Sequence, residues 1–136
     1  MSRVKHLVLF LLILLMGIIL DLAPIQVPDG IDKLYHFSGF ALLTGFAIST
    51  YISFYGQNSL NYFFVFLLTF GGVFAGVAEF LQEFVLIREC SAGDWLMNLL
   101  GITIMVAIAY LNNSKNKKNT ELNEGQFDFS DLPALS

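Results

Sequence analysis

The chain has few charged residues, which argues against a soluble domain. It has a single cysteine, which excludes an intramolecular disulfide. Charged residues make up only 13% of the 136 residues, whereas hydrophobic residues make up 56%. A soluble domain of this size needs far more charged surface, so the composition is that of an integral membrane protein. Cys90 has no second cysteine with which to form an intramolecular disulfide, so cysteine usage does not report a redox compartment.

Basic residues are also few, and their arrangement gives no support to nucleic acid as a partner. The chain has seven lysines and arginines, and no basic stripe with interleaved aromatics. The net charge of −4 comes from the acidic end of the chain, which holds Glu121, Glu124, Asp128 and Asp131. The length allows one domain at most.

Four long apolar runs dominate what is present. They extend from Leu7 to Leu20, from about Leu34 to Phe54, from about Leu60 to Val85, and from about Trp95 to Leu111. Backbone groups in hydrocarbon must pair within their own segment, so each run predicts a helix. Residues 1–111 are therefore expected to form an all-α, integral membrane four-helix bundle.

The first run has a competing interpretation as a cleaved signal peptide. It is short, and the basic residues Arg3 and Lys5 precede it, as they would in a secretory signal. The sequence after Leu20 offers no small-x-small cleavage site, however. We therefore expect this run to be a retained span.

The positive charges predict the orientation. Five basic residues flank the two ends of the bundle, namely Arg3, Lys5, Lys115, Lys117 and Lys118. An even number of spans places both termini on one side, and the positive-inside rule makes that side the cytoplasm. The expected location is the bacterial cytoplasmic (inner) membrane, crossed several times, with the loops after the first and third runs facing outward.

The character of the chain changes after Leu111. Residues 112–136 are polar and then acidic, with too little apolar surface to fold alone, so we expect a disordered cytoplasmic tail. The segment from Phe127 to Pro133 has the composition of a short peptide ligand for a protein partner. A merely solvated tail is the plainer interpretation.

Two polar groups interrupt the apolar pattern. The first, at the start of the second run, consists of Asp32, Lys33 and His36. The second, around the loop between the third and fourth runs, consists of Glu79, Gln82, Arg88, Asp94 and Asn98. Two spans return the chain to the face that it left, so both groups are expected to meet in one outer-face site.

Glu79 is the most informative single residue. It falls on one helical stripe with Gly72, Gly76 and Glu83. Glycines four residues apart permit close approach of a neighbouring helix, so the stripe should face the bundle. An ionisable group at that depth is costly and needs a partner or a function; a bond that only locks two helices is the alternative. The expected partners are His36, Arg88 or Asn98.

Each of the other site residues also has a structural interpretation. Asp32 is either the N-cap of its helix or the partner that orients His36 for proton transfer or ligand binding. Asp94 is expected to cap the fourth span, with Asn98 one turn further in. Asn98 shares a face with Gly101, which favours close helix contact.

The remaining polar residues suit ligand contacts. The planar guanidinium of Arg88 suits a phosphate or a carboxylate, although it could instead neutralise neighbouring acids. Gln82 lies one turn after Glu79 and could share its partner. No cofactor is expected. A metal site from Asp32, His36, Glu79 and Asp94 is conceivable, but no metal-motif spacing such as His-Glu-x-x-His supports it.

At these residues the chain resembles the VanZ-like membrane proteins, a family named for a teicoplanin-resistance protein. The matching residues are Asp32-Lys33-x-x-His36-Phe37-x-x-Phe40 and Glu79-x-x-Gln82-x-Phe84-x-x-x-Arg88-x-x-x-x-x-Asp94-x-x-x-Asn98-x-x-Gly101. The resemblance extends from about Asp29 to Gly101, and residues 85–87 lack the proline expected before the arginine. It implies a role at the cell envelope and no particular reaction. A link to antibiotic (glycopeptide) tolerance is one such role, and the resemblance alone does not carry it over to this chain.

Three functions are compatible with these residues. The first is a non-enzymatic protein whose outer-face site engages an anionic membrane lipid or a peptidoglycan-precursor group through Lys33 and Arg88. The second is an enzyme acting on a lipid head group, with Glu79 or His36 as general base. The third is a structural subunit of an envelope complex, whose polar network only assembles helices.

Overall fold

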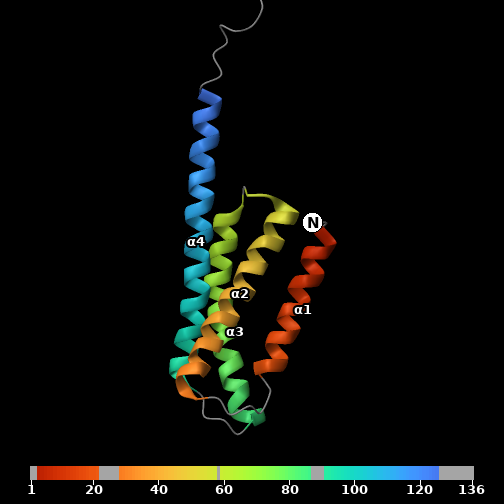
Figure 1. Cartoon of the computed structure of the whole chain (residues 1–136), viewed down its shortest axis with the longest axis vertical. Helices are drawn as coiled ribbons and strands as arrows, with labels where there is room; N and C mark the ends of the chain where they lie inside the picture. The colour runs from red at the N-terminus through yellow and green to blue at the C-terminus, as the bar shows by residue number, and fades with distance from the viewer. Residues whose placement is uncertain (1–2, 22–27, 58, 87–90, 126–136) are drawn as a thin grey trace, which may run out of the picture.

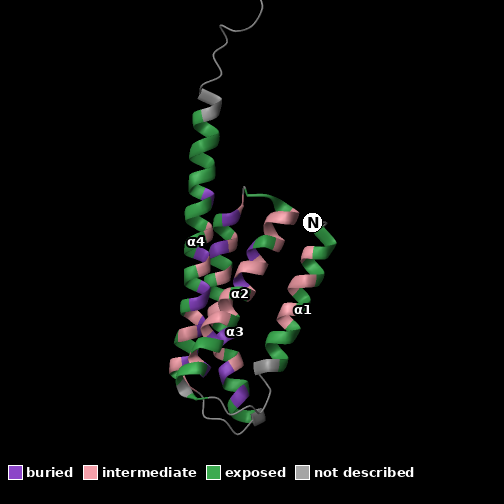
Figure 2. Ribbon diagram, in the orientation of Figure 1, coloured by how far each residue is buried: buried purple, intermediate pink, exposed green. Residues whose placement is uncertain are grey.

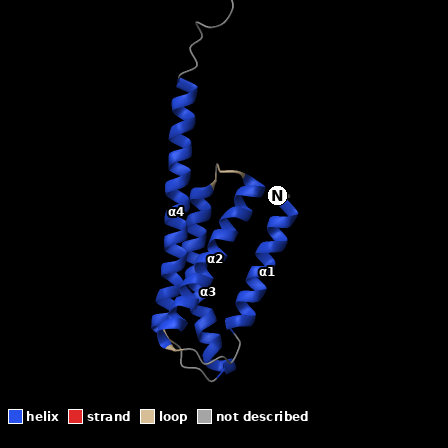
Figure 3. Ribbon diagram, viewed as in Figure 1, coloured by secondary structure: helices blue, strands red, loops and turns tan. Residues whose placement is uncertain are grey.

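The computed structural model describes residues 3–21, 28–57, 59–86 and 91–125. Within these residues the chain forms four helices and no strand (Figure 3). The helices are α1 (Arg3–Asp21), α2 (Asp29–Tyr55), α3 (Leu60–Leu86) and α4 (Ala92–Gly125). The prediction of an all-α chain with four helices is therefore confirmed.

The helices run alternately up and down, with α1 on the outer side of α2 (Figure 1). The most extensive packing is between α2 and α4, while α3 packs on α4 and α1 packs on α2. The start of α1 and the turn between α2 and α3 lie at one end of the bundle. The starts of α2 and α4 and the end of α3 lie together at the other end. This second end holds the described residues of both polar groups.

Three of the helices are long and apolar enough to cross a membrane. They are Gly30–Tyr55, Leu60–Phe84 and Ala92–Leu122. Large apolar side chains such as Phe70, Val73 and Phe84 are exposed on these helices, and Figure 2 shows exposed residues interspersed along all of them. Apolar surface of this extent indicates a lipid environment. The first helix has 19 residues and is not among the three.

Close contact between α2 and α4 depends on Gly101. A Cβ atom at this position would collide with the carbonyl oxygen of Phe37 and would lie 3.0 Å from the backbone nitrogen of Ala41. The two backbones can therefore approach only because residue 101 has no side chain. The close contact that the sequence predicts on the face shared by Asn98 and Gly101 is confirmed.

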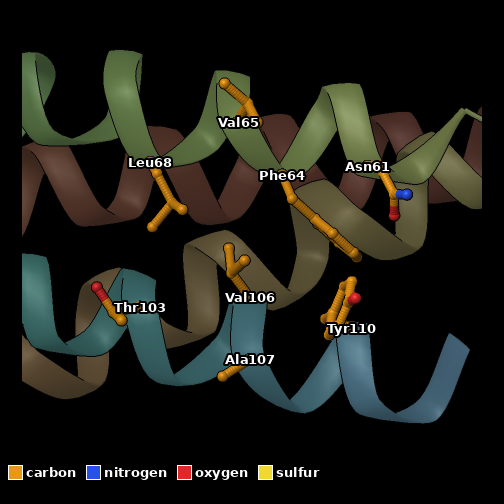
Figure 4. Close-up of a pocket in the computed structure, with 8 residues that line it drawn as sticks. All are labelled: Asn61, Phe64, Val65, Leu68, Thr103, Val106, Ala107 and Tyr110. Carbon is orange, nitrogen blue, oxygen red and sulfur yellow. The ribbon is translucent and has the colours of Figure 1, made fainter. Parts of the chain in front are cut away.

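An apolar core fills the half of the bundle away from the polar end. It consists of Ile48, Leu60, Phe64, Ile102 and Val106. Beside this core, a shallow groove of about 480 Å³ runs between α3 and α4 (Figure 4). Its wall is almost entirely apolar, so it offers space to a hydrocarbon chain rather than to polar chemistry.

The prediction of a disordered tail is wrong for residues 112–125, because α4 continues to Gly125. Extending a helix that the apolar segment has already nucleated costs little. Lysine and glutamate favour helix, and Glu121 lies three and four residues after Lys118 and Lys117, at spacings that place opposite charges side by side. Residues 126–136, with the peptide-like segment, lie outside the described part of the chain.

Candidate functional site

Six of the predicted site residues form a buried polar cluster at the common end of α2, α3 and α4. Each is at most 8% exposed; the six are Asp32, His36, Glu79, Gln82, Asp94 and Asn98. Burying this many polar and ionisable groups is costly unless they are paired. The expectation that two motifs distant in sequence meet at one end of the bundle is therefore met by the geometry.

His36 lies at the centre of the cluster. On one side its Nδ1 is 3.2 Å from Asn98 Oδ1 and 3.4 Å from Glu79 Oε1. On the other side its Nε2 is 3.8 Å from Asp32 Oδ1 and 4.0 Å from Asp94 Oδ2. The predicted contact of Glu79 with His36 or Asn98 is confirmed, because Glu79 contacts both.

Asn98 determines which nitrogen of His36 carries a proton. Its Nδ2 donates to Glu79 Oε1 at 3.2 Å, so its Oδ1 is the atom that faces His36. An amide oxygen only accepts, and therefore His36 Nδ1 must be the donor in the 3.2 Å hydrogen bond. Asn98 thus links α2 to α3 through α4 and orients the imidazole ring.

The helix starts position the two aspartates, but neither aspartate is the N-cap. The N-cap of α2 is Pro28, whose carbonyl oxygen accepts the backbone N–H groups of Ile31 and Asp32. Asp32 lies inside the first turn, four residues before His36, and points to the same face. The N-cap interpretation of Asp32 is therefore wrong.

At the start of α4 the capping side chain is Ser91, because its Oγ accepts the backbone N–H of Asp94 at 3.3 Å. The expectation that Asp94 caps this helix is wrong: Asp94 is the third residue of α4, and its carboxylate turns into the cluster. The role of Ser91 as the cap of α4 was not predicted from the sequence. The spacing Ser91-x-x-Asp94 was the available signal, since it matches the capping-box pattern.

Of the two basic residues predicted for the site, Lys33 lies at the edge of the polar cluster. Lys33 is half-buried, and its chain passes over the start of α4, where its Cε is 3.2 Å from the position of a Cβ on Gly93. Arg88 lies in the segment 87–90, outside the described residues. Lys33 therefore places one positive charge next to the cluster.

The stripe on α3 is only partly as predicted. Gly72 and Gly76 face α4, but they are covered by the side chains of Leu99 and Trp95 rather than by a backbone. Trp95 Nε1 donates to the carbonyl oxygen of Gly72 at 3.2 Å, a tie between α3 and α4 that the sequence did not predict. Glu83 is exposed. The buried residues on this part of α3 are instead 75, 79 and 82.

The cluster offers several ligand atoms. One atom each from Asp32, His36 and Asp94 lies within 4.8 Å of the other two, so these three residues form a group that could hold a metal ion. Glu79 and His36, the candidate general bases, lie side by side. No family model, curated protein or solved structure matches the chain, so the VanZ-like resemblance depends on the motif residues alone.

Proposed function

We propose that the chain is a VanZ-like protein of the bacterial inner membrane whose polar cluster forms an outer-face site for an anionic lipid or peptidoglycan-precursor head group. The observation that carries the proposal is the burial of six polar side chains from two separate motifs at one end of an apolar bundle. Helix packing alone does not need them, because apolar side chains pack as well or better.

The anion is assigned to the basic residues rather than to the cluster itself. Asp32, Glu79 and Asp94 would repel a phosphate that entered among them. Lys33 is half-buried at the edge of the cluster, and Arg88 follows α3 in the sequence. Both carry a positive charge that suits a phosphate. The cluster then orients these groups and accepts hydrogen bonds from hydroxyl or amine groups of the ligand.

The proposal requires four crossings, with α1 as the first, and both termini in the cytoplasm. Cys90, the only cysteine, then faces outward. In spheroplasts, a membrane-impermeant maleimide should label Cys90 in the native protein. A Cys90→Ser, Asn119→Cys variant should react only after the membrane is permeabilised. The reverse pattern would place the cluster on the cytoplasmic side and contradict the proposal.

The head-group preference can be measured through Trp95, the only tryptophan, which lies next to Asp94. In reconstituted vesicles, brominated anionic phospholipid should quench Trp95 at lower mole fraction than brominated zwitterionic phospholipid. One basic residue near a charged surface contributes about 1 kcal/mol, so Lys33→Ala should weaken the anionic preference about fivefold. Lys115→Ala, at the opposite end, is the matched control and should leave it unchanged. Equal quenching by both lipids in the native protein counts against an anion site.

A membrane enzyme acting on a lipid head group is the second candidate. The observation that favours it is the position of His36 between Glu79 on one side and Asp32 on the other. Either His36 or Glu79 could act as general base toward a bound substrate. Detection of a modified lipid after incubation with the native protein, and not with Glu79→Gln, would favour the enzyme over a binding protein.

A further inference from the structure

We propose that Asp32, His36 and Asp94 bind one divalent transition-metal ion, of which Zn²⁺ is the representative. All three residues are buried, and one ligand atom from each lies within 4.8 Å of the others. One imidazole nitrogen and two carboxylate oxygens are a ligand set that suits zinc and its neighbours. The inference concerns a cation and does not depend on the proposed head-group site.

The hydrogen bonds of His36 point to a cation at its Nε2. Because Nδ1 donates to Asn98 Oδ1, Nε2 is the ring nitrogen that faces the carboxylates of Asp32 and Asp94 and can offer a lone pair to a cation between them. The two carboxylates and this nitrogen then face one another in a buried space, where a positive charge between them is favourable. A metal ion bound to all three atoms supplies that charge.

The distances fit a shared ion after a small closure. Two ligand atoms about 2.1 Å from one zinc ion are at most about 4.2 Å apart, and about 3.4 Å in a tetrahedron. His36 Nε2 lies 3.8 Å from Asp32 Oδ1 and 4.0 Å from Asp94 Oδ2. Both distances are too long for a hydrogen bond and within the limit for a common metal ion.

Asp94 supplies an independent observation. Its Oδ1 is buried and has no hydrogen-bond partner among the described residues. The carboxylate as a whole is nearly enclosed, with 6% of its side chain exposed, and its Oδ2 faces His36. Burial removes the water that would hydrate this oxygen, and no hydrogen bond replaces that water. A bound cation would supply the missing interaction.

The surroundings of His36 are those that metal-bound histidines usually have. Such a histidine donates its second N–H to a carbonyl or carboxylate oxygen, which fixes the tautomer and the ring orientation. Here Asn98 Oδ1 accepts that hydrogen bond, and Glu79 in turn accepts one from Asn98. Three protein ligands leave a fourth position of a tetrahedral ion open to water or another small ligand.

Metal analysis of the purified chain tests the inference. The full-length protein, carrying an affinity tag without histidine, is extracted in detergent, treated with chelator, and titrated with Zn²⁺. We expect one ion bound per chain in the native protein. Asp94→Asn and His36→Gln should each weaken binding by at least about tenfold, since they remove ligands rather than the outer groups whose loss already costs about 10- to 100-fold.

Three control variants separate this site from other zinc ligands on the chain. His6→Gln removes the only other histidine, and Cys90→Ser removes the only thiol; both variants should retain full binding. Glu83→Gln removes an exposed carboxylate one turn from Glu79 and should also retain it. Loss of binding in any of these three variants, with retention in Asp94→Asn, would overturn the assignment.

X-ray absorption of the native zinc-loaded protein tests the ligands without any substitution. We expect a first shell of oxygen and nitrogen that contains a single imidazole and no sulfur. A sulfur shell, two imidazoles, or failure of the native chain to retain zinc would each contradict the proposal. Because these outcomes do not involve lipid, they are distinguishable from failure of the head-group site.

Discussion

Asn98→Ala is expected to destabilise the fold by about 2–4 kcal/mol, because it removes two buried hydrogen bonds at once. Asn98 is fully buried, donates to Glu79 Oε1 and accepts from His36 Nδ1. Each interaction lost from a buried donor or acceptor costs about 1–3 kcal/mol, and more where the group is charged. Thermal unfolding of the detergent-solubilised protein measures the loss.

Asn113→Ala is the matched control for this prediction. Asn113 lies on the same helix and is 5% exposed, but its Oδ1 has no hydrogen-bond partner among the described residues. Removing such a group gives up little, so the variant should be nearly as stable as the native protein or slightly more stable. Equal destabilisation by both substitutions would show that burial, rather than the hydrogen-bond network, accounts for the effect.

Gly101→Ala is expected to have a comparable effect through the backbone. The added methyl group would collide with the carbonyl oxygen of Phe37, and backbone atoms cannot move aside as a flexible side chain can. Helices α2 and α4 would have to separate along their most extensive contact. Overpacking of this kind costs about 1–3 kcal/mol, and the separation would also disturb the cluster that the two helices share.

Gly39→Ala isolates this effect from the general preference of helices for alanine. Gly39 lies on α2, and a Cβ atom there would have no neighbour within 4 Å. Alanine is favoured over glycine in a helix by about 1 kcal/mol, so Gly39→Ala should preserve or raise the unfolding temperature. If Gly101→Ala also preserves or raises the unfolding temperature, α2 and α4 do not approach each other as closely as the structure shows.

The helices could be predicted because the signal is local. Each apolar run is long enough to require a helix, and its length sets the bounds to within a few residues. The C-terminal extension of α4 could not be predicted, since residues 112–125 have no apolar face and depend on a helix that begins at Ala92. The polarity of this segment by itself predicts disorder.

The site could be predicted as a set of residues but not as a geometry. Helices α2 and α3 run in opposite directions, which brings Asp32 and His36 to the same end as Glu79, Asp94 and Asn98. Sequence does not reveal the tautomer of His36, because that depends on the orientation of one amide on another helix. The sequence offered Asp32, His36 and Asp94 as conceivable metal ligands without supporting a metal site, because they come from two helices and no local spacing relates Asp94 to His36.

A bound divalent ion would also remove a difficulty in the proposed function. The acids of the cluster repel a phosphate, whereas an ion with an open coordination position offsets their charge and can accept a phosphate oxygen. Lys33 at the edge adds a second positive charge. Zinc and an anionic head group would then occupy neighbouring positions at one end of the bundle.

Native mass spectrometry of the chain released from its own membrane tests most directly whether the polar cluster is a head-group site. We expect one class of phosphate-bearing lipid, or a peptidoglycan precursor, to remain bound at a level well above its share of the membrane extract. Lys33→Ala should retain about fivefold less of it, and Lys115→Ala should retain as much as the native protein. Lipids bound in the proportions of the bulk membrane, alike in all three proteins, would contradict the account and leave the cluster as a lock between helices.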